Sequence, residues 1–304
     1  MTDKPNCACT SQSAAPSVPE LEARIEELRG QVGSLATQMA TAMLSRTNDE
    51  ASRRQTREAG QLLVRIIGGV PADPGTYSEC CLIGNSSGGG FLNEWFCTGT
   101  LIHPRVVVTA LHCIAPGQGA PNPNSIAIGV EDQRKVRTEH IHRVLRIERS
   151  ATSDIALLIL QKPSTVAPVA LATSEQVANA GTIHLVGFGN TDKKGLIGFG
   201  IKREVEVPMN VVRSTPDQDL TEAEGVLGFN SRTEFVAGRK GSGQDSCNGD
   251  SGGPAYIGSG GNRVLAGATS RATDEADDNC GDGGIYVRLD AHADWIGQVI
   301  AELG

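Results

Sequence analysis

The chain has 304 residues, of which 39% are hydrophobic, 20% are charged and 37 are glycine, and its net charge is −8. This composition is typical of a turn-rich globular protein with more strand than helix, and no run of about 18 apolar residues predicts a transmembrane helix. The first 65 residues are neutral overall, so residues 66–304 carry the whole net charge of −8. An acidic main domain argues against nucleic acid as a partner.

Residues 1–65 predict a prosegment in three parts. Residues 1–19 are polar and rich in Ser, Pro and Ala, which is typical of a disordered tail. Apolar residues then recur at alternating spacings of four and three, which predicts a helix over about 20–43. We interpret this helix either as a short coiled coil through which the chain self-associates, or as a single amphipathic helix packed on its own main domain. Residues 45–65 are polar and rich in arginine and predict a linker.

From residue 66 the chain becomes a series of short β-branched runs separated by Gly, Pro, Asn and Asp. The runs are RVVVTAL, SIAIGV, IALLIL, GTIHLVGF, REVEVPM, RVLAGAT and GIYVRL. Their spacing predicts an all-β domain over residues 66–304, either a barrel or a sandwich. The final stretch, DAHADWIGQVIAELG, has one apolar face and predicts a C-terminal helix.

Eight cysteines are spread along this chain, and they are Cys7, Cys9, Cys80, Cys81, Cys97, Cys113, Cys247 and Cys280. An even number in a β-rich chain favours disulfides and an oxidising compartment. The spacing lacks CxxC pairs and histidine clusters, so we expect no metal site. The first 20 residues have no apolar core and do not resemble a signal peptide. Secretion, a periplasmic location and an intracellular location therefore remain alternatives.

Three polar residues stand in settings that suit nucleophilic catalysis. A serine hydroxyl needs a base to remove its proton, and the base must be held by a third group. His112 ends the apolar run VVVTALHC, Asp154 precedes the run in SDIALLIL, and Ser251 lies in GDSGGP. With these motifs in this order, residues 66–304 resemble a trypsin-like serine protease of the chymotrypsin-fold family.

This resemblance implies a fold of two six-stranded antiparallel β-barrels with a C-terminal α-helix. It implies that His112 is the general base, that Asp154 orients it, and that Ser251 attacks the scissile carbonyl. The backbone N–H groups of Gly249 and Ser251 would form the oxyanion hole, and Ser270 would hydrogen-bond the aspartate. We expect no cofactor.

The stretch LLVRIIGGV resembles the activation junction of the same family. Cleavage after Arg65 would free the α-amine of Ile66, which would then pair with Asp250 beside the nucleophile. The pairing would lock the backbone of the oxyanion hole, because a buried carboxylate without a counter-charge is costly. The uncleaved chain would then be a zymogen.

The resemblance also implies a preference for Arg or Lys at the cleaved bond of protein and peptide substrates. Asp245 would form the floor of the primary specificity pocket, and Gly284 would be its small wall residue. Arg271 and Ala272 stand where the family usually has an aromatic residue and a glycine. These two departures leave the strength of the Arg/Lys selectivity open.

Two disulfides follow from the resemblance, one beside the histidine and one behind the pocket, and they are Cys97–Cys113 and Cys247–Cys280. Cys80 and Cys81 have no family counterpart, and one hypothesis pairs them with Cys7 and Cys9.

The sequence offers three alternatives to a secreted, active protease. The sequence GDSGG also fits the nucleophile elbow of α/β-hydrolases, but that fold needs a histidine after the serine, and only His292 follows. A non-catalytic protease homologue would be a binding or scaffold module. An intracellular protease would be kept silent by its prosegment and switched on by a partner through the helix at 20–43.

Overall fold

The computed structural model describes residues 68–87, 93–114, 122–192, 197–211, 222–278 and 280–303. The prosegment expected at 1–65, with its helix, Arg65 and its two cysteines, lies outside the described residues, and so does Ile66. Within the described ranges, none of the helices has the length and apolar character needed to cross a bilayer.

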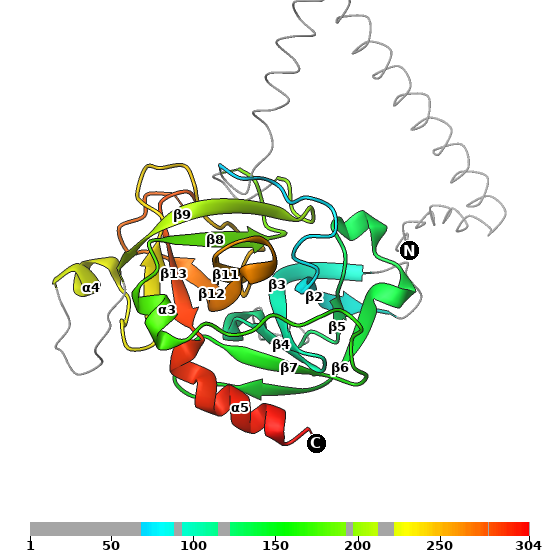
Figure 1. The fold of residues 1–304 in the computed structure, drawn as a ribbon. Helices are drawn as coiled ribbons and strands as arrows, with labels where there is room; N and C mark the ends of the chain where they lie inside the picture. Colours follow the sequence, from blue (N-terminus) through cyan, green and yellow to red (C-terminus); the bar gives the residue numbers. More distant parts are fainter. Residues whose placement is uncertain are drawn as a thin grey trace, which may run out of the picture. The chain divides into compact units, whose positions relative to one another are not determined.

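The first half of the described chain forms a closed barrel of six antiparallel strands. The strands are β2 (Cys80–Ser86), β3 (Asn93–His103), β4 (Val106–Thr109), β5 (Ser125–Ala127), β6 (Ile141–Arg149) and β7 (Ala156–Leu160). They pair in the order β2-β3-β4-β7-β6-β5, and β5 pairs back to β2 (Figure 1). Every residue of β4 and β7 is buried, and apart from the threonine that ends β4 both strands consist of apolar residues.

The second half forms another closed barrel. Its strands are β8 (Thr182–Gly187), β9 (Arg203–Val211), β10 (Glu234–Ala237), β11 (Pro254–Ile257), β12 (Val264–Ala272) and β13 (Gly284–Arg288). They pair in the order β9-β10-β13-β12-β11-β8, and β8 pairs back to β9. A short strand, β1 (Val70–Pro71), adds to the outer edge of β9. The expected fold of two six-stranded antiparallel barrels is confirmed.

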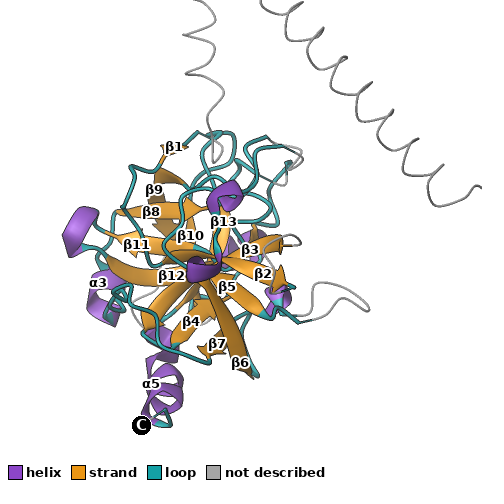
Figure 2. Ribbon diagram, turned by 90° about the vertical axis from the view of Figure 1, so that its right-hand side faces the viewer, coloured by secondary structure: helices purple, strands orange, loops and turns teal. Residues whose placement is uncertain are grey.

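Helices are few and short in the described residues. They are α3 (Ser174–Ala178), α4 (Glu222–Leu227) and α5 (Ala293–Ala301). One-turn 3₁₀ helices occur at Leu111–Cys113, Gln133–Lys135, Thr138–His140, Gly260–Asn262 and Asp290–His292. Helix α5 is the expected C-terminal helix, and it lies beside β6 and β7 (Figure 2). Ile296 and Val299 are its buried residues, and Arg146 of β6 pairs with Glu302 at 3.2 Å.

One apolar cluster crosses from the first barrel to the second. It joins Val106 and Leu157 to Tyr256 and Val287. A buried ion pair crosses at the same junction, because Arg263 donates to both carboxylate oxygens of Glu79 at 2.7 Å. The Tyr256 hydroxyl donates to the same carboxylate at 2.8 Å. Burial alone would raise the pKa of Glu79, but these hydrogen bonds bring that pKa below its ordinary value. The two barrels are therefore held together by both apolar and charged contacts.

Candidate active site

His112 and Asp154 meet because two antiparallel strands bring their ends together. Thr109 ends β4 opposite Ala156, which begins β7, so the residues just beyond these positions are neighbours. The backbone N–H of His112 donates to Asp154 Oδ1 at 2.9 Å, and the ring Nδ1 lies 2.8 Å from Oδ2. Asp154 thus fixes both the main chain and the ring of His112.

A third group holds Asp154 from the second barrel. The Ser270 hydroxyl on β12 donates to Asp154 Oδ2 at 2.6 Å. Burial would raise the pKa of Asp154, but the hydrogen bonds and charge of His112 and the hydrogen bond of Ser270 bring that pKa below its ordinary value. A carboxylate that stays ionised keeps the proton of the histidine ring on Nδ1, which leaves Nε2 free to accept one.

Ser251 lies next to the segment that carries His112. The carbonyl oxygen of Ser251 is 3.6 Å from Sγ of Cys113 and accepts a hydrogen bond from the Thr98 N–H at 3.0 Å. The side chain of Ser251 is partly exposed, and its hydroxyl makes no hydrogen bond with any described residue. The hydroxyl therefore makes no hydrogen bond to the His112 ring in this structure, and it remains available to an incoming group.

The backbone before Ser251 has the conformation that an anion-binding loop needs. Gly249 has φ +97°, a value that residues with a β-carbon rarely adopt. The N–H groups of Gly249 and Ser251 donate to no described residue. The Asn248 carbonyl accepts from the Asn190 N–H at 2.8 Å, which fixes the peptide unit that carries the Gly249 N–H. Two unengaged donors in one short loop are what an oxyanion hole requires.

Asp250 points away from this loop into the protein. Its Oδ1 accepts from the Gly189 N–H at 2.7 Å, and its Oδ2 accepts from the Cys247 N–H at 2.8 Å. Burial raises the pKa of Asp250 to about 7, against these hydrogen bonds and the charge of Arg203. The carboxylate therefore lacks a full counter-charge within the described residues.

A small cavity of about 80 Å³ lies beside Ser251, with Asp245 in its lining. Oδ1 of Asp245 accepts from the Ser246 N–H at 2.7 Å and from the Tyr286 hydroxyl at 3.1 Å. Burial raises the pKa of Asp245 to about 6 despite these bonds. A β-carbon on Gly284 would lie 3.0 Å from the Tyr286 hydroxyl and 3.2 Å from Oδ1, so glycine leaves room for this hydrogen-bonded pair, although Gly284 does not itself line the cavity.

Arg271 also lines this cavity, together with Ala272. Its guanidinium binds Glu234 through two hydrogen bonds of 2.7 and 3.0 Å. Arg271 and Glu234 also line a second cavity of about 530 Å³, whose lining includes His112 and Asp154. Glu234 was not predicted as a site residue, because it lies 37 positions from Arg271 in the sequence.

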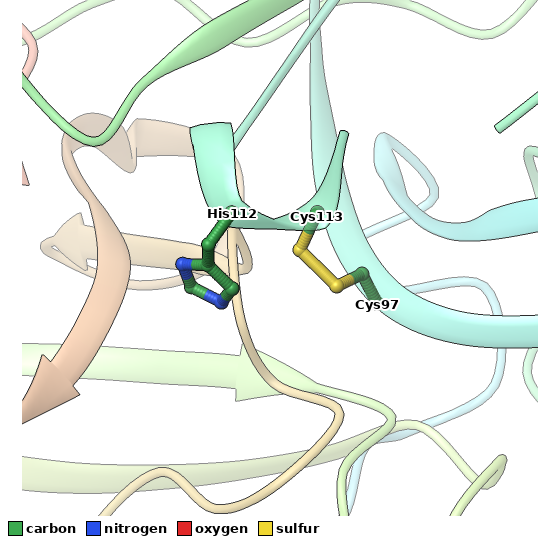
Figure 3. Close-up of side chains that lie close together, drawn as sticks. All are labelled: Cys97, His112 and Cys113. Carbon is green, nitrogen blue, oxygen red and sulfur yellow. A yellow bond between two sulfur atoms is a disulfide. The ribbon is translucent and has the colours of Figure 1, made fainter. Parts of the chain in front are cut away.

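Both expected disulfides are confirmed, and they are Cys97–Cys113 and Cys247–Cys280. The first disulfide lies directly beside the ring of His112 (Figure 3). The donor atoms of these three residues lie within 4.8 Å of one another, but both sulfurs are oxidised and so offer no thiolate to a metal.

The hypothesis that Cys80 and Cys81 form bridges is wrong for this structure, since both are free thiols with no exposed surface. They lie in β2, the wall of the first barrel, where a bridge to an outside segment would break the packing. Burial raises the pKa of each thiol well above its ordinary value.

Two joined six-stranded barrels, with the histidine on one and the serine on the other, define the chymotrypsin fold. The Trypsin family matches residues 66–296. Coagulation factor IX from Oryctolagus cuniculus is 32% identical over 257 residues, which cover 79% of this chain and 86% of that protein. The chain belongs to the trypsin-like serine protease family, whose members are hydrolases that act on protein substrates.

Proposed function

We propose that this protein is an active serine endopeptidase in which His112, Asp154 and Ser251 act as the catalytic triad. The observation that carries the proposal is the double hydrogen bond from His112 to Asp154, through the backbone N–H and through Nδ1. Asp154 also accepts a bond from Ser270, so the carboxylate that orients the histidine is itself held on a second side.

In the proposed reaction, Nε2 of His112 takes the proton of Ser251 as Oγ bonds to the scissile carbonyl carbon. The resulting oxyanion accepts hydrogen bonds from the N–H groups of Gly249 and Ser251. His112 then gives the proton to the leaving nitrogen, and the C–N bond breaks to leave an acyl-enzyme. A water molecule gives a proton to His112 and attacks the ester carbon. The bond from that carbon to Oγ then breaks, His112 returns the proton to Oγ, and the carboxylic acid leaves.

We infer that the cleaved bond follows Arg or Lys. A guanidinium or ammonium group in the small cavity would pair with the Asp245 carboxylate. A neutral side chain would leave that buried carboxylate unpaired, so discrimination should be strong. The methyl group of Ala272 in the cavity lining would narrow the path of the substrate side chain to Asp245, without changing the preference for a positive charge.

We further propose that residues 1–65 are a prosegment and that cleavage between Arg65 and Ile66 activates the enzyme. The support is Asp250, which is buried and whose raised pKa indicates an incomplete counter-charge in the uncleaved chain. A new α-ammonium group would supply that charge and would stabilise the backbone from Gly249 to Ser251. The same Arg/Lys preference would allow an active molecule to cut Arg65 of another.

The experiment incubates the full chain, before and after limited trypsin treatment, with short chromogenic peptides ending in Arg, Lys or Phe. N-terminal sequencing identifies which products begin at Ile66. Ser251→Ala should abolish hydrolysis, and Ser259→Ala, an exposed serine outside the site, should leave it unchanged.

We expect Arg and Lys peptides to be cleaved only after the chain has been cut at Arg65. If material that begins at Ile66 cleaves no peptide, the protein is a binding module rather than an enzyme. Self-activation requires that purified Ser251→Ala chain remains uncut at Arg65 while the parent chain is processed.

A further inference from the structure

Thr98 connects the first barrel to the loop that carries the nucleophile. This residue lies on β3 and has no exposed surface. Its hydroxyl donates to the Gly249 carbonyl at 2.7 Å and accepts from the Phe188 N–H at 3.4 Å. Its backbone N–H donates to the Ser251 carbonyl at 3.0 Å. One residue of the first barrel therefore binds the loop of the second barrel at two carbonyl groups.

These two carbonyls stand on either side of one peptide unit. The Gly249 carbonyl precedes Asp250, the Ser251 carbonyl follows it, and the Ser251 N–H lies between them along the chain. With both flanking carbonyls held by Thr98, the plane that carries this N–H has little freedom to rotate. The Asp250 N–H also donates to the Cys247 carbonyl at 2.9 Å, and the Asp250 carbonyl accepts from the Gly253 N–H at 2.7 Å.

The chemistry of the Thr98 hydroxyl suits this position, because a hydroxyl can donate one hydrogen bond and accept another at the same time. A valine of the same shape would leave the Gly249 carbonyl without its donor in a part-buried place. The unbound carbonyl could then turn toward water, and the peptide units next to it would turn as well.

We propose that the Thr98 hydroxyl is a positioning group that aims the oxyanion-hole donors of Gly249 and Ser251. This inference rests on the proposed protease function. It makes Thr98 a residue that supports the reaction without touching the substrate. Donors contribute to catalysis only when they point at the oxyanion before it forms, so an error in their direction lowers the rate of the chemical step.

The strand offers a matched control in Thr100, two residues further along β3. Thr100 is also fully buried, and its hydroxyl has no hydrogen-bond partner among the described residues. Thr98→Val and Thr100→Val make the same chemical change on the same face of one strand. Only Thr98→Val removes a bond to the catalytic loop, and Thr98→Ser keeps it.

Kinetics of the activated enzyme with an Arg-ended peptide test the proposal. Thr98→Val should lower kcat by about 10- to 100-fold with little change in KM, since removing a donor outright costs about 10²- to 10³-fold in other enzymes. A peptide boronate, which mimics the tetrahedral intermediate, should lose affinity in parallel. Benzamidine, which would bind only in the Asp245 cavity, should keep its Kd. Thr98→Ser and Thr100→Val should stay within about threefold of the parent in all three measurements.

Amide hydrogen exchange separates a failure of this proposal from a failure of the protease function. It is measured in the Ser251→Ala background on residues 247–253, where no catalysis is needed. Faster exchange in Thr98→Val than in Thr100→Val is expected even if the parent chain cleaves no peptide. The proposal is overturned if the two valine variants behave alike in exchange, or if kcat falls equally in both.

Discussion

The carboxylate of Asp250 occupies the place that a side chain at position 187 would need. A β-carbon built on Gly187 would overlap Asp250 Oδ1, and one on Gly189 would overlap Oδ2. Glycine at these two positions therefore makes the buried niche for Asp250. Neither residue has a positive φ, so the requirement is one of space and not of backbone conformation.

Gly187→Ala should consequently destabilise the fold by about 2–3 kcal/mol, the usual cost of overpacking a rigid core. Urea denaturation of the uncleaved Ser251→Ala chain measures this change without interference from proteolysis. Gly181→Ala is the control, because nothing lies within 4 Å of a β-carbon there. Equal free energies of unfolding for the two variants would show that Asp250 is free to leave its niche.

The pKa of Asp245 predicts how binding of a cationic ligand depends on pH. Since burial raises this pKa to about 6, the carboxyl is protonated below pH 6 and must lose its proton to pair with an amidinium group. The affinity for benzamidine should be constant above pH 7 and should fall about tenfold for each pH unit below 6. Isothermal titration calorimetry between pH 4.5 and 8 measures it. Asp245→Asn should bind weakly at every pH, and a flat profile in the parent would contradict the assignment.

Arg203 should control the response of Asp250 to pH. Arg203 pairs with Gly187 in the β8–β9 ladder, and Asp250 Oδ1 fills the space of a side chain at Gly187, so Arg203 and Asp250 lie near each other. Nε and Nη1 of Arg203 are buried and have no hydrogen-bond partner among the described residues. The pKa of Arg203 lies below its ordinary value because of burial, and the charge of Asp250 opposes this shift.

The pKa of Asp250 is higher in the folded protein than in the unfolded chain. The free energy of unfolding therefore falls as pH rises from the unfolded pKa toward the folded pKa. Arg203 limits that loss by lowering the pKa of Asp250. Arg203→Met should therefore match or exceed the parent in stability near pH 4, and should be the less stable of the two at pH 8. Urea titrations of the Ser251→Ala chain at both pH values measure this, with the exposed Arg239→Met as control. A difference that is independent of pH would show that the charge has no role.

Ala272→Gly tests whether the methyl group narrows the cavity that we propose binds the Arg or Lys side chain of the substrate. Removing it should raise kcat/KM for Arg peptides about tenfold, mostly through KM, because one methyl group in a pocket changes binding by about 1–3 kcal/mol. The ratio of Arg to Phe cleavage should rise as well, since Asp245 is unchanged. Unaltered kinetics would place the limit on selectivity elsewhere, with Arg271 as the next candidate.

Cys80 and Cys81 should resist alkylation in the folded protein, because both thiols are buried and their pKa values are high. The measurement uses a variant with Cys7→Ser and Cys9→Ser, so that labelling reports on β2 alone. Iodoacetamide at pH 8 should label neither thiol in buffer and should label both in urea. Rapid labelling in buffer would mean that the first barrel opens locally.

The seven β-branched runs in the sequence predict β4, β5, β7, β8, β9, β12 and β13, whereas β2 and β10 were missed although nearly all of their residues are buried. The runs around Val107, Leu158 and Val287 correspond to β4, β7 and β13. Strand β6 escaped prediction because it is half-exposed along its length and carries arginines at 143, 146 and 149. Strand β11 escaped because it begins inside the GDSGGP motif, whose glycines and proline indicate a turn.

The residues of the candidate site also differ in how far the sequence predicts them. His112, Asp154 and Ser251 could be selected because each lies in a short motif with local chemical meaning. Thr98, Arg203 and Glu234 could not be selected, because their contacts join residues 151, 16 and 37 positions apart. The role of Thr98 depends on how the two barrels meet, and the roles of Arg203 and Glu234 depend on how distant strands of the second barrel pair, which no window of sequence contains.

The division of the site between the barrels has a consequence for how the molecule loses activity. His112 and Asp154 belong to one barrel, and Ser251 and Ser270 belong to the other, with Thr98 and the Asp154–Ser270 bond joining the two sides. A slight sliding of the halves against each other would separate the proposed base from the proposed nucleophile while each half kept its own hydrogen-bonded strands. On gentle heating, hydrolysis should therefore cease at a lower temperature than the circular dichroism of the strands begins to change.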